Sequence, residues 1–440
     1  VGLLISAAVA FQRLPEPAEN IPPLPRPAEA GSTEFAEQLR RIGPELARSA
    51  PPAEATDERQ PAPTYAGQTL DEWRDRIRQL DPNDPRSAAA VPGLMELVAD
   101  RQVPWFTRRD AALTLGRLGK AGAPAVDLLA RLLDEPPQNN VSPASWSTRA
   151  LALLGPDAAE ASPRLVQLLR NPARDAGDRM AAIDALARIG AGQPQSLPTL
   201  ISFLTVRPGA ASGLSDSLAI TFRELAAQGL GLMGAEAAAA VPALLRAGRD
   251  EHESVRQEAT LALAAMGPAA EIAVPGLLER LVSDDSEAVQ DAAETALAAV
   301  ATREAQQALA HLLGDEEPEF RWRAARSLGR MGQAAADAEP SLLVCLQDPE
   351  PQVQLQAALA CQAIGVRQAE AAETLVELLH SDKRQIRIQA TRSLIAAPEA
   401  ARQLLEQLQQ LAEQGDPQGR RAARQVLEQI LPTNESPESR

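Results

Sequence analysis

Apolar side chains recur along most of this chain with the spacing of amphipathic helices. Between residues 255 and 266 they stand at Val255, Ala259, Ala262, Leu263 and Met266, which all fall on one face of an α-helix. This block has the pattern V-R-x-x-A-x-x-A-L-x-x-M-G, and further copies lie at Val289–Ala301, Phe320–Gly332, Val353–Gly365 and Ile386–Pro398. Glycine ends many of the blocks, as expected where a helix terminates in a left-handed residue. Each block therefore predicts one helix.

The blocks return at a nearly constant interval. We take the alanine at the fifth place of each block as its anchor, which gives Ala111, Ala150, Ala182, Ala226, Ala259, Ala293, Ala324, Ala357, Ala390 and Ala423. Most intervals between successive anchors are 31 to 34 residues, whereas two are 39 and 44 residues. A period in this range over ten units is typical of a solenoid, in which each unit buries its apolar face only against its neighbours.

A shorter apolar stretch precedes each block and predicts a first helix for every repeat. Many of these stretches open on proline, which suits a first helical turn because the N–H that it lacks would be unpaired there. They include Val91-Pro92, Ala123-Pro124, Ser162-Pro163, Val241-Pro242, Val274-Pro275 and Glu339-Pro340. We predict an all-α fold, a right-handed α-solenoid of about ten two-helix repeats over residues 92–431. Capping helices over residues 67–91, with Thr69 as the N-cap of a helix from Leu70 to Leu80, should close its N-terminal end.

Both ends of the chain differ from the repeats. Residues 1–11 (VGLLISAAVAF) form an apolar run that is too short to span a bilayer and fits a truncated signal peptide or membrane anchor. Residues 12–66 are rich in proline and predict an extended, disordered linker, and residues 432–440 predict a disordered tail. We expect export to the cell envelope, periplasmic or membrane-anchored. The alternative is an unstructured apolar start on a cytoplasmic protein.

The overall charge argues against two classes of partner. The formal net charge is −16, whereas nucleic-acid binding and docking on anionic lipid both rest on a basic surface. Aromatic residues make up only 2% of the chain, so the core should consist of alanine, leucine and valine in closely packed helices. We therefore expect no nucleic-acid partner.

Several residues suggest chemistry, but each has a structural explanation. Cys345 and Cys361 lie in consecutive predicted helices, either as two small buried hydrophobes or as a disulfide that would need an oxidising compartment. Acidic loops precede the second helices at Asp250–Glu253, Asp284–Glu287, Asp315–Glu319 and Asp348–Glu350. They lack the spacing of calcium-binding loops, and acidic residues in this place pair with free N–H groups at helix N-termini.

The two long intervals contain inserts rich in proline, glycine, serine and asparagine. They lie at Asp134–Ser145 and Thr205–Asp216 and predict loops. Such inserts either tune recognition or reflect tolerated variation in length. An arginine also stands three residues before the anchor in seven repeats, at Arg108, Arg179, Arg223, Arg256, Arg321, Arg387 and Arg420. We expect these arginines to pair with acidic loop residues between repeats, ahead of any contact with a ligand.

The block V-R-x-x-A-x-x-A-L-x-x-M-G, with its proline-initiated first helix, resembles the short HEAT repeats of bacteria that are described as phycobilisome-lyase-like. The resemblance covers roughly residues 92 to 430. It implies a scaffold or adaptor, and it also brings in enzymatic relatives, namely bilin lyases, a di-iron deoxyhypusine hydroxylase and a group of DNA-repair glycosylases.

The enzymatic relatives find little support in the residues. The hydroxylase holds its irons through His-Glu pairs just before the anchor, but none of the ten corresponding residues here is histidine. His252-Glu253 lies in a loop, outside that frame, and His311 and His380 stand alone. We can point to no residue signature for bilin-lyase activity. We therefore expect no catalytic residue, no metal and no cofactor, and a PBS-lyase-like or hydroxylase-like enzyme stays as the alternative.

A possible partner site lies on the second helices of three successive repeats. The places two before and two after the anchor are one helical turn apart and off the core face. Over three repeats they hold Trp322/Arg326, Leu355/Leu359 and Ile388/Arg392. If exposed, these six residues form an apolar strip with arginines at both ends, as is typical of a binding surface. If not, they pack between repeats.

The sequence as a whole indicates a non-catalytic scaffold that binds another protein. We expect a monomer, with an N-terminal membrane tether as one form of the envelope location. The sequence does not identify the partner.

Overall fold

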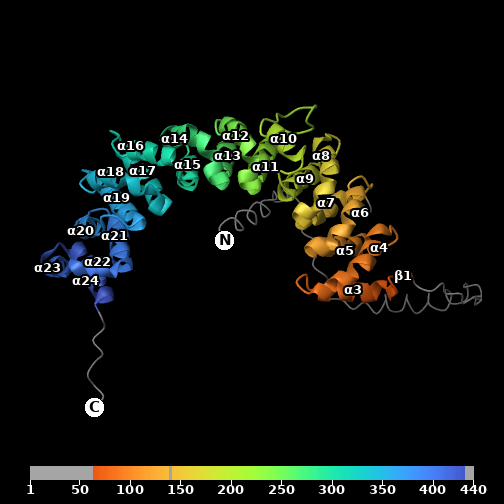
Figure 1. The fold of residues 1–440 in the computed structure, drawn as a ribbon, viewed down its shortest axis with the longest axis horizontal. Helices are drawn as coiled ribbons and strands as arrows, with labels where there is room; N and C mark the ends of the chain where they lie inside the picture. Colours follow the sequence, from red (N-terminus) through yellow and green to blue (C-terminus); the bar gives the residue numbers. More distant parts are fainter. Residues whose placement is uncertain (1–62, 138–140, 432–440) are drawn as a thin grey trace, which may run out of the picture. The chain divides into compact units, whose positions relative to one another are not determined.

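A computed structural model describes residues 63–137 and 141–431. The expectations for residues 1–11, for most of the linker and for the tail 432–440 fall outside the described residues. Figure 1 shows the described helices following one another in chain order as successive pairs, which confirms the all-α solenoid.

Each repeat consists of a first and a second helix, joined by the loop that carries the acidic residues. The first helices are α4 (Val91–Ala99), α6 (Val126–Leu132), α8 (Ser162–Arg170), α10 (Ser196–Phe203), α12 (Val241–Ala247), α14 (Val274–Ser283), α16 (Arg303–Leu312), α18 (Glu339–Cys345), α20 (Gln368–Glu377) and, in the tenth repeat, α22 (Pro398–Gln403) with α23 (Leu405–Gln414). The second helices are α5 (Trp105–Arg117), α7 (Pro143–Leu154), α9 (Ala176–Ile189), α11 (Asp216–Met233), α13 (Glu253–Met266), α15 (Glu287–Val300), α17 (Pro318–Met331), α19 (Pro351–Ile364), α21 (Arg384–Ala396) and α24 (Pro417–Ile430).

The N-terminal end is closed by a helix and a small hairpin. Thr69 caps α3 (Leu70–Gln79) through a reciprocal pair of contacts with Glu72, as its sequence predicted. Before it, β1 (Thr64–Tyr65) pairs antiparallel with β2 (Gln68–Thr69). The linker was expected to include residues 63–66, but the Tyr65 side chain is buried and its hydroxyl donates to Asp100 at 2.8 Å. The indole N–H of Trp73 donates to the Tyr65 carbonyl, so the array begins a few residues earlier than expected.

Short 3₁₀ helices connect successive repeats. They are η2 (Gly119–Ala125), η3 (Gly155–Ala161), η4 (Gly234–Ala240), η5 (Gly267–Ala273) and η6 (Gly332–Ala338), with η1 (Pro85–Ala90) before α4 and η7 (Leu378–His380) after α20. Proline stands in the first turn of α4, α8, α12, α14 and α18 as expected. Pro124 is an exception, because it lies inside η2 and α6 begins only at Val126.

The anchor alanines form the core, but the assigned register of the second repeat was wrong. All ten have no exposed surface. Helix α7 ends at Gly155, with φ 58°, at the position of Gly267 and Gly332 in their repeats. Counting back from Gly155 places Ser147, not Ala150, at the anchor position. Ser147 is fully buried and donates to the Leu129 carbonyl at 2.5 Å. A serine whose buried hydroxyl donates to a backbone carbonyl replaces alanine here. Because the anchor was defined as an alanine, it was assigned one helical turn too late, to Ala150.

Five of the seven repeated arginines link their repeat to the next, and we call the set of seven the arginine ladder. Arg321 lies in α17, is mostly buried, and donates through Nη1 to the loop carbonyls of Asp315 and Glu316 in its own repeat at 2.8 Å. Its Nε and Nη2 reach the Asp348 carboxylate of the next repeat at 2.7 and 2.9 Å. Asp348 in turn accepts the backbone N–H of Glu350. One guanidinium therefore ties two loops together.

The same arrangement recurs along the array. Equivalent pairs are Arg108–Glu135, Arg223–Asp250 and Arg256–Asp284, with N–O distances of 2.9, 3.0 and 2.8 Å. These pairs confirm the expected role of four of the seven arginines. Arg387 reaches only the loop carbonyls of Ser381 and Asp382 in its own repeat.

Both inserts supply ladder acceptors. Glu135, which pairs with Arg108, belongs to the first insert. Among the residues that the structure describes, Arg179 makes no ion pair with a carboxylate, and its Nη1 donates instead to the Ser212 carbonyl of the second insert at 2.9 Å. Burial without a counter-charge lowers the pKa of Arg179. The second insert is therefore folded against the preceding repeat, with Leu214 buried, rather than projecting freely.

Small residues let adjacent second helices approach closely. Five residues after the anchor, Gly116, Gly231 and Gly329 each face the residue three after the anchor position of the next repeat, which is Ala150, Ala262 or Ala360. A Cβ atom on Gly116 would lie 2.7 Å from the Ala150 carbonyl oxygen, a distance that backbone atoms do not tolerate. These contacts also support the corrected register of α7.

The membrane-like hydropathy of two stretches follows from the repeat core. Asp216–Ala247 and Glu253–Ser283 are long and apolar enough, by composition, to cross a membrane. Each consists of a second helix, a 3₁₀ turn and the next first helix. Apolar residues such as Ala226, Leu230 and Leu244 are fully buried and account for part of this composition, since 44% and 39% of the two apolar windows are buried.

Replacing Gly116 with leucine should force α5 and α7 apart. We expect Gly116→Leu to lower the free energy of unfolding by about 1–3 kcal/mol, the usual cost of overpacking. The control is Gly192→Ala, in a loop with no atom near the added Cβ, and it should change the free energy by less than about 0.5 kcal/mol. Urea unfolding of both variants tests this, and equal midpoints would contradict the close-approach argument.

Candidate protein-interaction surface

The side chains two before and two after each anchor form one surface of the array, and we call it the second-helix surface. In repeats 7 to 9 it was expected to carry the six strip residues. Trp322, on α17, is half-buried, and the guanidinium groups of Arg323 and Arg326 lie 4.7 and 4.9 Å from its ring centre. The indole is therefore held in place by cation–π contacts while part of it stays exposed.

Leu355 is not part of this surface. It has no exposed area and belongs to the apolar core. The expected strip is thus interrupted, and Leu359 is half-buried against the core.

The ninth repeat contributes one partly exposed and one fully accessible side chain. Ile388 is partly exposed on α21, and Arg392 is exposed one turn further along. Arg392 makes no ion pair within residues 63–137 and 141–431. The two ends of the strip therefore differ, because Arg326 is engaged and Arg392 is available.

A buried carboxylate holds Arg326 beside Trp322. Glu294, one residue after the anchor in α15, has no exposed surface. It accepts from Arg323 Nη1 at 2.8 Å and from Arg326 Nε at 2.5 Å, and Arg330 lies 3.7 Å away. Burial by itself would lower the pKa of Arg326, but its bonds to Glu294 and to Asp291 raise it. The sequence reasoning missed this cluster. Its signal was a charged residue where the other repeats carry mostly Ala, Thr or Ile.

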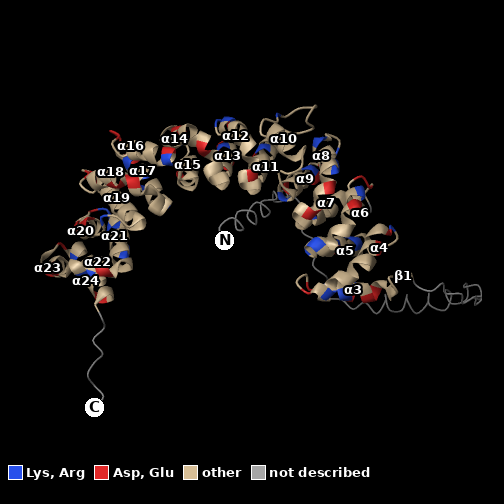
Figure 2. Cartoon of the chain, in the orientation of Figure 1, with Lys and Arg blue, Asp and Glu red and all other residues tan. Residues whose placement is uncertain are grey.

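The second-helix surface changes sign along the array. Glu224 and Asp291 lie on it in α11 and α15, whereas α19 carries no charged residue and stays tan in Figure 2. Glu258 in α13 stands one residue before its anchor, at the border of this surface. Burial raises the pKa of Glu258, a hydrogen bond from Gln228 opposes the rise, and the charge of Glu224 adds to it. Repeats 4 to 6 are therefore acidic on this surface or at its border.

Two exposed leucines were also missed. Leu153 and Leu232 are 47% and 61% exposed and occupy the place six after the anchor position of their repeats. This equivalence becomes visible only when the register of α7 is counted from Gly155. Single exposed leucines are common on soluble proteins, so these two do not define a site by themselves.

Comparison with known families agrees with the repeat pattern. The model of the HEAT repeats matches residues 208–298, 274–343, 307–395 and 339–428, and the model of the PBS lyase HEAT-like repeat matches residues 178–205. Together the matches cover more than half of the chain. The chain belongs to the HEAT-repeat family. No curated protein matches its sequence.

Solved structures similar to this HEAT-repeat chain include karyopherins. Kap121p is 14% identical, with 81% of this chain and 42% of that chain covered and a TM-score of 0.45. Kap95p from a structure with RanGDP is 14% identical, with 90% and 58% covered and a TM-score of 0.46. Human deoxyhypusine hydroxylase is 22% identical, with 70% and 95% covered and a TM-score of 0.27. The chain thus spans less than two thirds of the length of either karyopherin.

The described HEAT repeats contain no cluster suited to a metal ion. Within residues 63–137 and 141–431, no group of three or more His, Cys, Asp or Glu side chains is placed to hold one. His311 and His380 are exposed, and His380 contacts Asp416 at 3.1 Å. Cys345 and Cys361 are buried and free, which excludes a disulfide between them in this structure, and burial raises the pKa of their thiols to about 11 and about 12.

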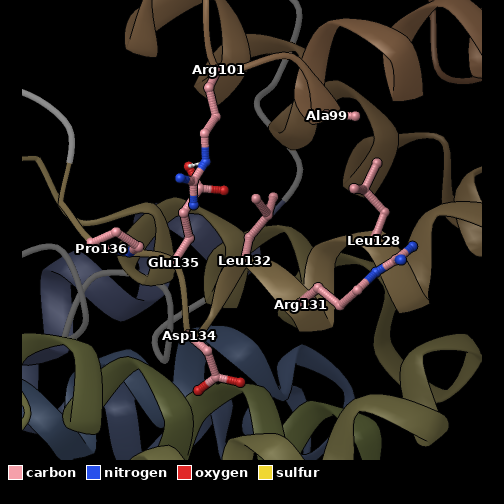
Figure 3. A pocket seen from close by; sticks show the side chains of 8 residues that line it. All are labelled: Ala99, Arg101, Leu128, Arg131, Leu132, Asp134, Glu135 and Pro136. Carbon is pink, nitrogen blue, oxygen red and sulfur yellow. Dashed lines mark ion pairs between the residues drawn. The ribbon is translucent and has the colours of Figure 1, made fainter.

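A hollow of about 430 Å³ lies beside the first insert of the HEAT array. Its lining comprises Ala99, Arg101, Leu128, Arg131, Leu132, Asp134, Glu135 and Pro136. Figure 3 shows Arg101 and Glu135 facing each other, and their Nε–Oε1 distance is 3.2 Å. Glu135 also serves the ladder through Arg108, so the charged centre of this hollow is engaged in holding repeats together.

The raised pKa of Glu258 predicts a pH dependence of stability. The folded protein binds the proton of the Glu258 carboxyl more tightly than the unfolded chain, in which the pKa of this group is near 4.5. The contribution of Glu258 to the free energy of unfolding is therefore fully present below pH 4.5. It is lost as the pH rises through the pKa of the folded state. We expect Glu258→Gln to raise the unfolding midpoint at neutral pH and to flatten its pH profile. Glu236→Gln, at an exposed position, is the control. A wild-type profile unchanged by Glu258→Gln would contradict the prediction.

Proposed function

We propose that this HEAT-repeat chain is a non-catalytic scaffold that binds another protein through the second-helix surface of repeats 7 to 9. The observation that carries the proposal is the partly exposed Trp322, held by Arg323 and Arg326. Tryptophan and arginine dominate the energetic centres of protein interfaces, and a pre-positioned side chain loses little entropy on binding.

Membership of the HEAT-repeat family supports an interaction role, because a solenoid offers an extended surface whose side chains are not all needed for folding. The enzymatic alternative, a lyase-like or hydroxylase-like activity, has no specific observation in its favour among the described residues. Export, a membrane tether and a monomeric state remain predictions, and the first two rest on residues outside the described part of the chain.

The proposal predicts that one partner is lost when the apolar part of the surface is removed. The test uses the full chain as bait in extract of the source organism, as wild type and as Trp322→Ala/Ile388→Ala. We expect the variant to retain the partner at least about 30-fold more weakly, the loss that corresponds to about 2 kcal/mol at a hot spot.

The matched control is Ile272→Ala/Val344→Ala, which removes exposed apolar side chains elsewhere on the array, 66% and 73% exposed. It should retain the partner fully. Circular dichroism checks that both variants keep the helical content of the wild type. Equal capture by both variants would place the site elsewhere, and failure of the wild type to retain any protein would contradict the scaffold function.

A further inference from the structure

Positive charge gathers on the second helices of the last four repeats, although the chain as a whole is acidic. The net charge is −16, yet α19 has no charged residue and α21 has no acidic one. Helix α21 carries Arg384, Arg387 and Arg392. Helix α24 carries three further arginines against a single acidic residue, Glu428. This segregation reverses the acidic character of α11, α13 and α15.

Four of these arginines are exposed and unpaired. Arg384, Arg392, Arg421 and Arg424 make no ion pair within residues 63–137 and 141–431. Exposed arginines on the opposite side of the repeats behave differently, since Arg131, Arg164 and Arg249 contact Asp127, Asp134 and Glu279 at 3.0, 3.0 and 2.6 Å. In an acidic protein, arginines left without a carboxylate leave their donors free for an external one.

Two of the free arginines, Arg392 and Arg421, share one surface with the strip. Arg392 stands two after its anchor and Arg421 two before the next, and α21 packs against α24. Both places belong to the second-helix surface that carries Trp322 and Ile388. Along repeats 7 to 10, apolar side chains thus alternate with cations that have no acidic neighbour on α19 or α21.

We infer that the second-helix surface of repeats 7 to 10 binds an acidic segment of a partner protein in which apolar residues are interspersed with Asp or Glu. Guanidinium groups pair with carboxylates through two parallel hydrogen bonds, and the apolar residues of the segment would lie against Trp322 and Ile388. The inference rests on the proposed function and adds the chemistry of the partner.

A polyanion such as nucleic acid fits this surface less well. Binding of nucleic-acid phosphates depends on many cationic side chains and little on apolar contacts. On this surface only a few arginines are present, and apolar residues separate them. Glu224 and Asp291, which lie on the same surface earlier in the row of helices, would repel a long polyanion.

Binding of synthetic probes to the full chain tests the inference. The probe is a fluorescein-labelled peptide of alternating glutamate and leucine, and its comparison is the same peptide with glutamine for glutamate. By fluorescence anisotropy we expect the glutamate peptide to bind at least about tenfold more tightly, with an affinity that falls as salt is raised. Equal binding of the two peptides would overturn the inference.

Charge reversal locates the site. Arg392→Glu/Arg421→Glu/Arg424→Glu should weaken binding of the glutamate peptide by at least about tenfold. Arg392→Gln/Arg421→Gln/Arg424→Gln, which removes the three charges without reversing them, should weaken this binding less. The matched control is Arg131→Glu/Arg164→Glu/Arg249→Glu, which changes the net charge equally on the other side and should keep the wild-type affinity. The inference fails if the control variant weakens peptide binding as much. It also fails if a single-stranded oligonucleotide displaces the labelled peptide at a lower concentration than the unlabelled peptide does.

The captured partner separates this inference from the proposed function. If the wild type and the charge-reversed variant capture the same partner equally well, the scaffold function is supported and recognition of an acidic segment is contradicted. If the reversed variant loses that partner while the control keeps it, both are supported.

Discussion

A buried guanidinium that bridges two consecutive loops is the interaction on which the array depends. Removing an arginine from water is costly unless its donors are filled, and for Arg108, Arg179, Arg223, Arg256 and Arg321 the donors are filled partly by carbonyls of the same repeat and partly by an acceptor of the next. Arg256, for example, bonds the Asp250 carbonyl and the Asp284 carboxylate. These five repeats therefore do not satisfy their arginines by themselves. Stability has to arise between repeats, as the one-dimensional logic of a solenoid requires.

This arrangement leaves the second-helix surface free to vary. The anchors, the glycines and the arginine ladder lie in the core and the loops. In most repeats, the side chains two before and two after the anchor are therefore not part of the contacts that hold the repeats together. Where two charged residues did enter the contact between helices, at Glu294 and Arg323, they pair with each other and also position Arg326. The surface can then be acidic over repeats 4 to 6 and basic over repeats 7 to 10 without a change of fold.

The sequence predicted the architecture because periodicity alone specifies it. Nine of the ten anchors, the ladder arginines and the N-cap of α3 all follow from spacing, and each is visible without coordinates. Ser147 was missed because a hydroxyl bonded to a carbonyl can replace alanine, which no apolar pattern anticipates. Leu355 was misplaced because its burial depends on how neighbouring helices pack, which the spacing within one helix does not report. Glu294 was overlooked since its partners come from a different repeat.

The measurement that tests the central claim most directly is a double-mutant cycle on Arg321 and Asp348. Arg321→Met and Asp348→Leu each leave one buried charged group without its partner, so each should cost about 3–5 kcal/mol, and the double variant should cost much less than their sum. Hydrogen exchange at α17 and α19 reports the local free energy of opening in an array that need not unfold in one step. A coupling of about 2 kcal/mol or more supports the ladder. Additivity within about 0.5 kcal/mol would show that the two loops are held together by apolar packing alone.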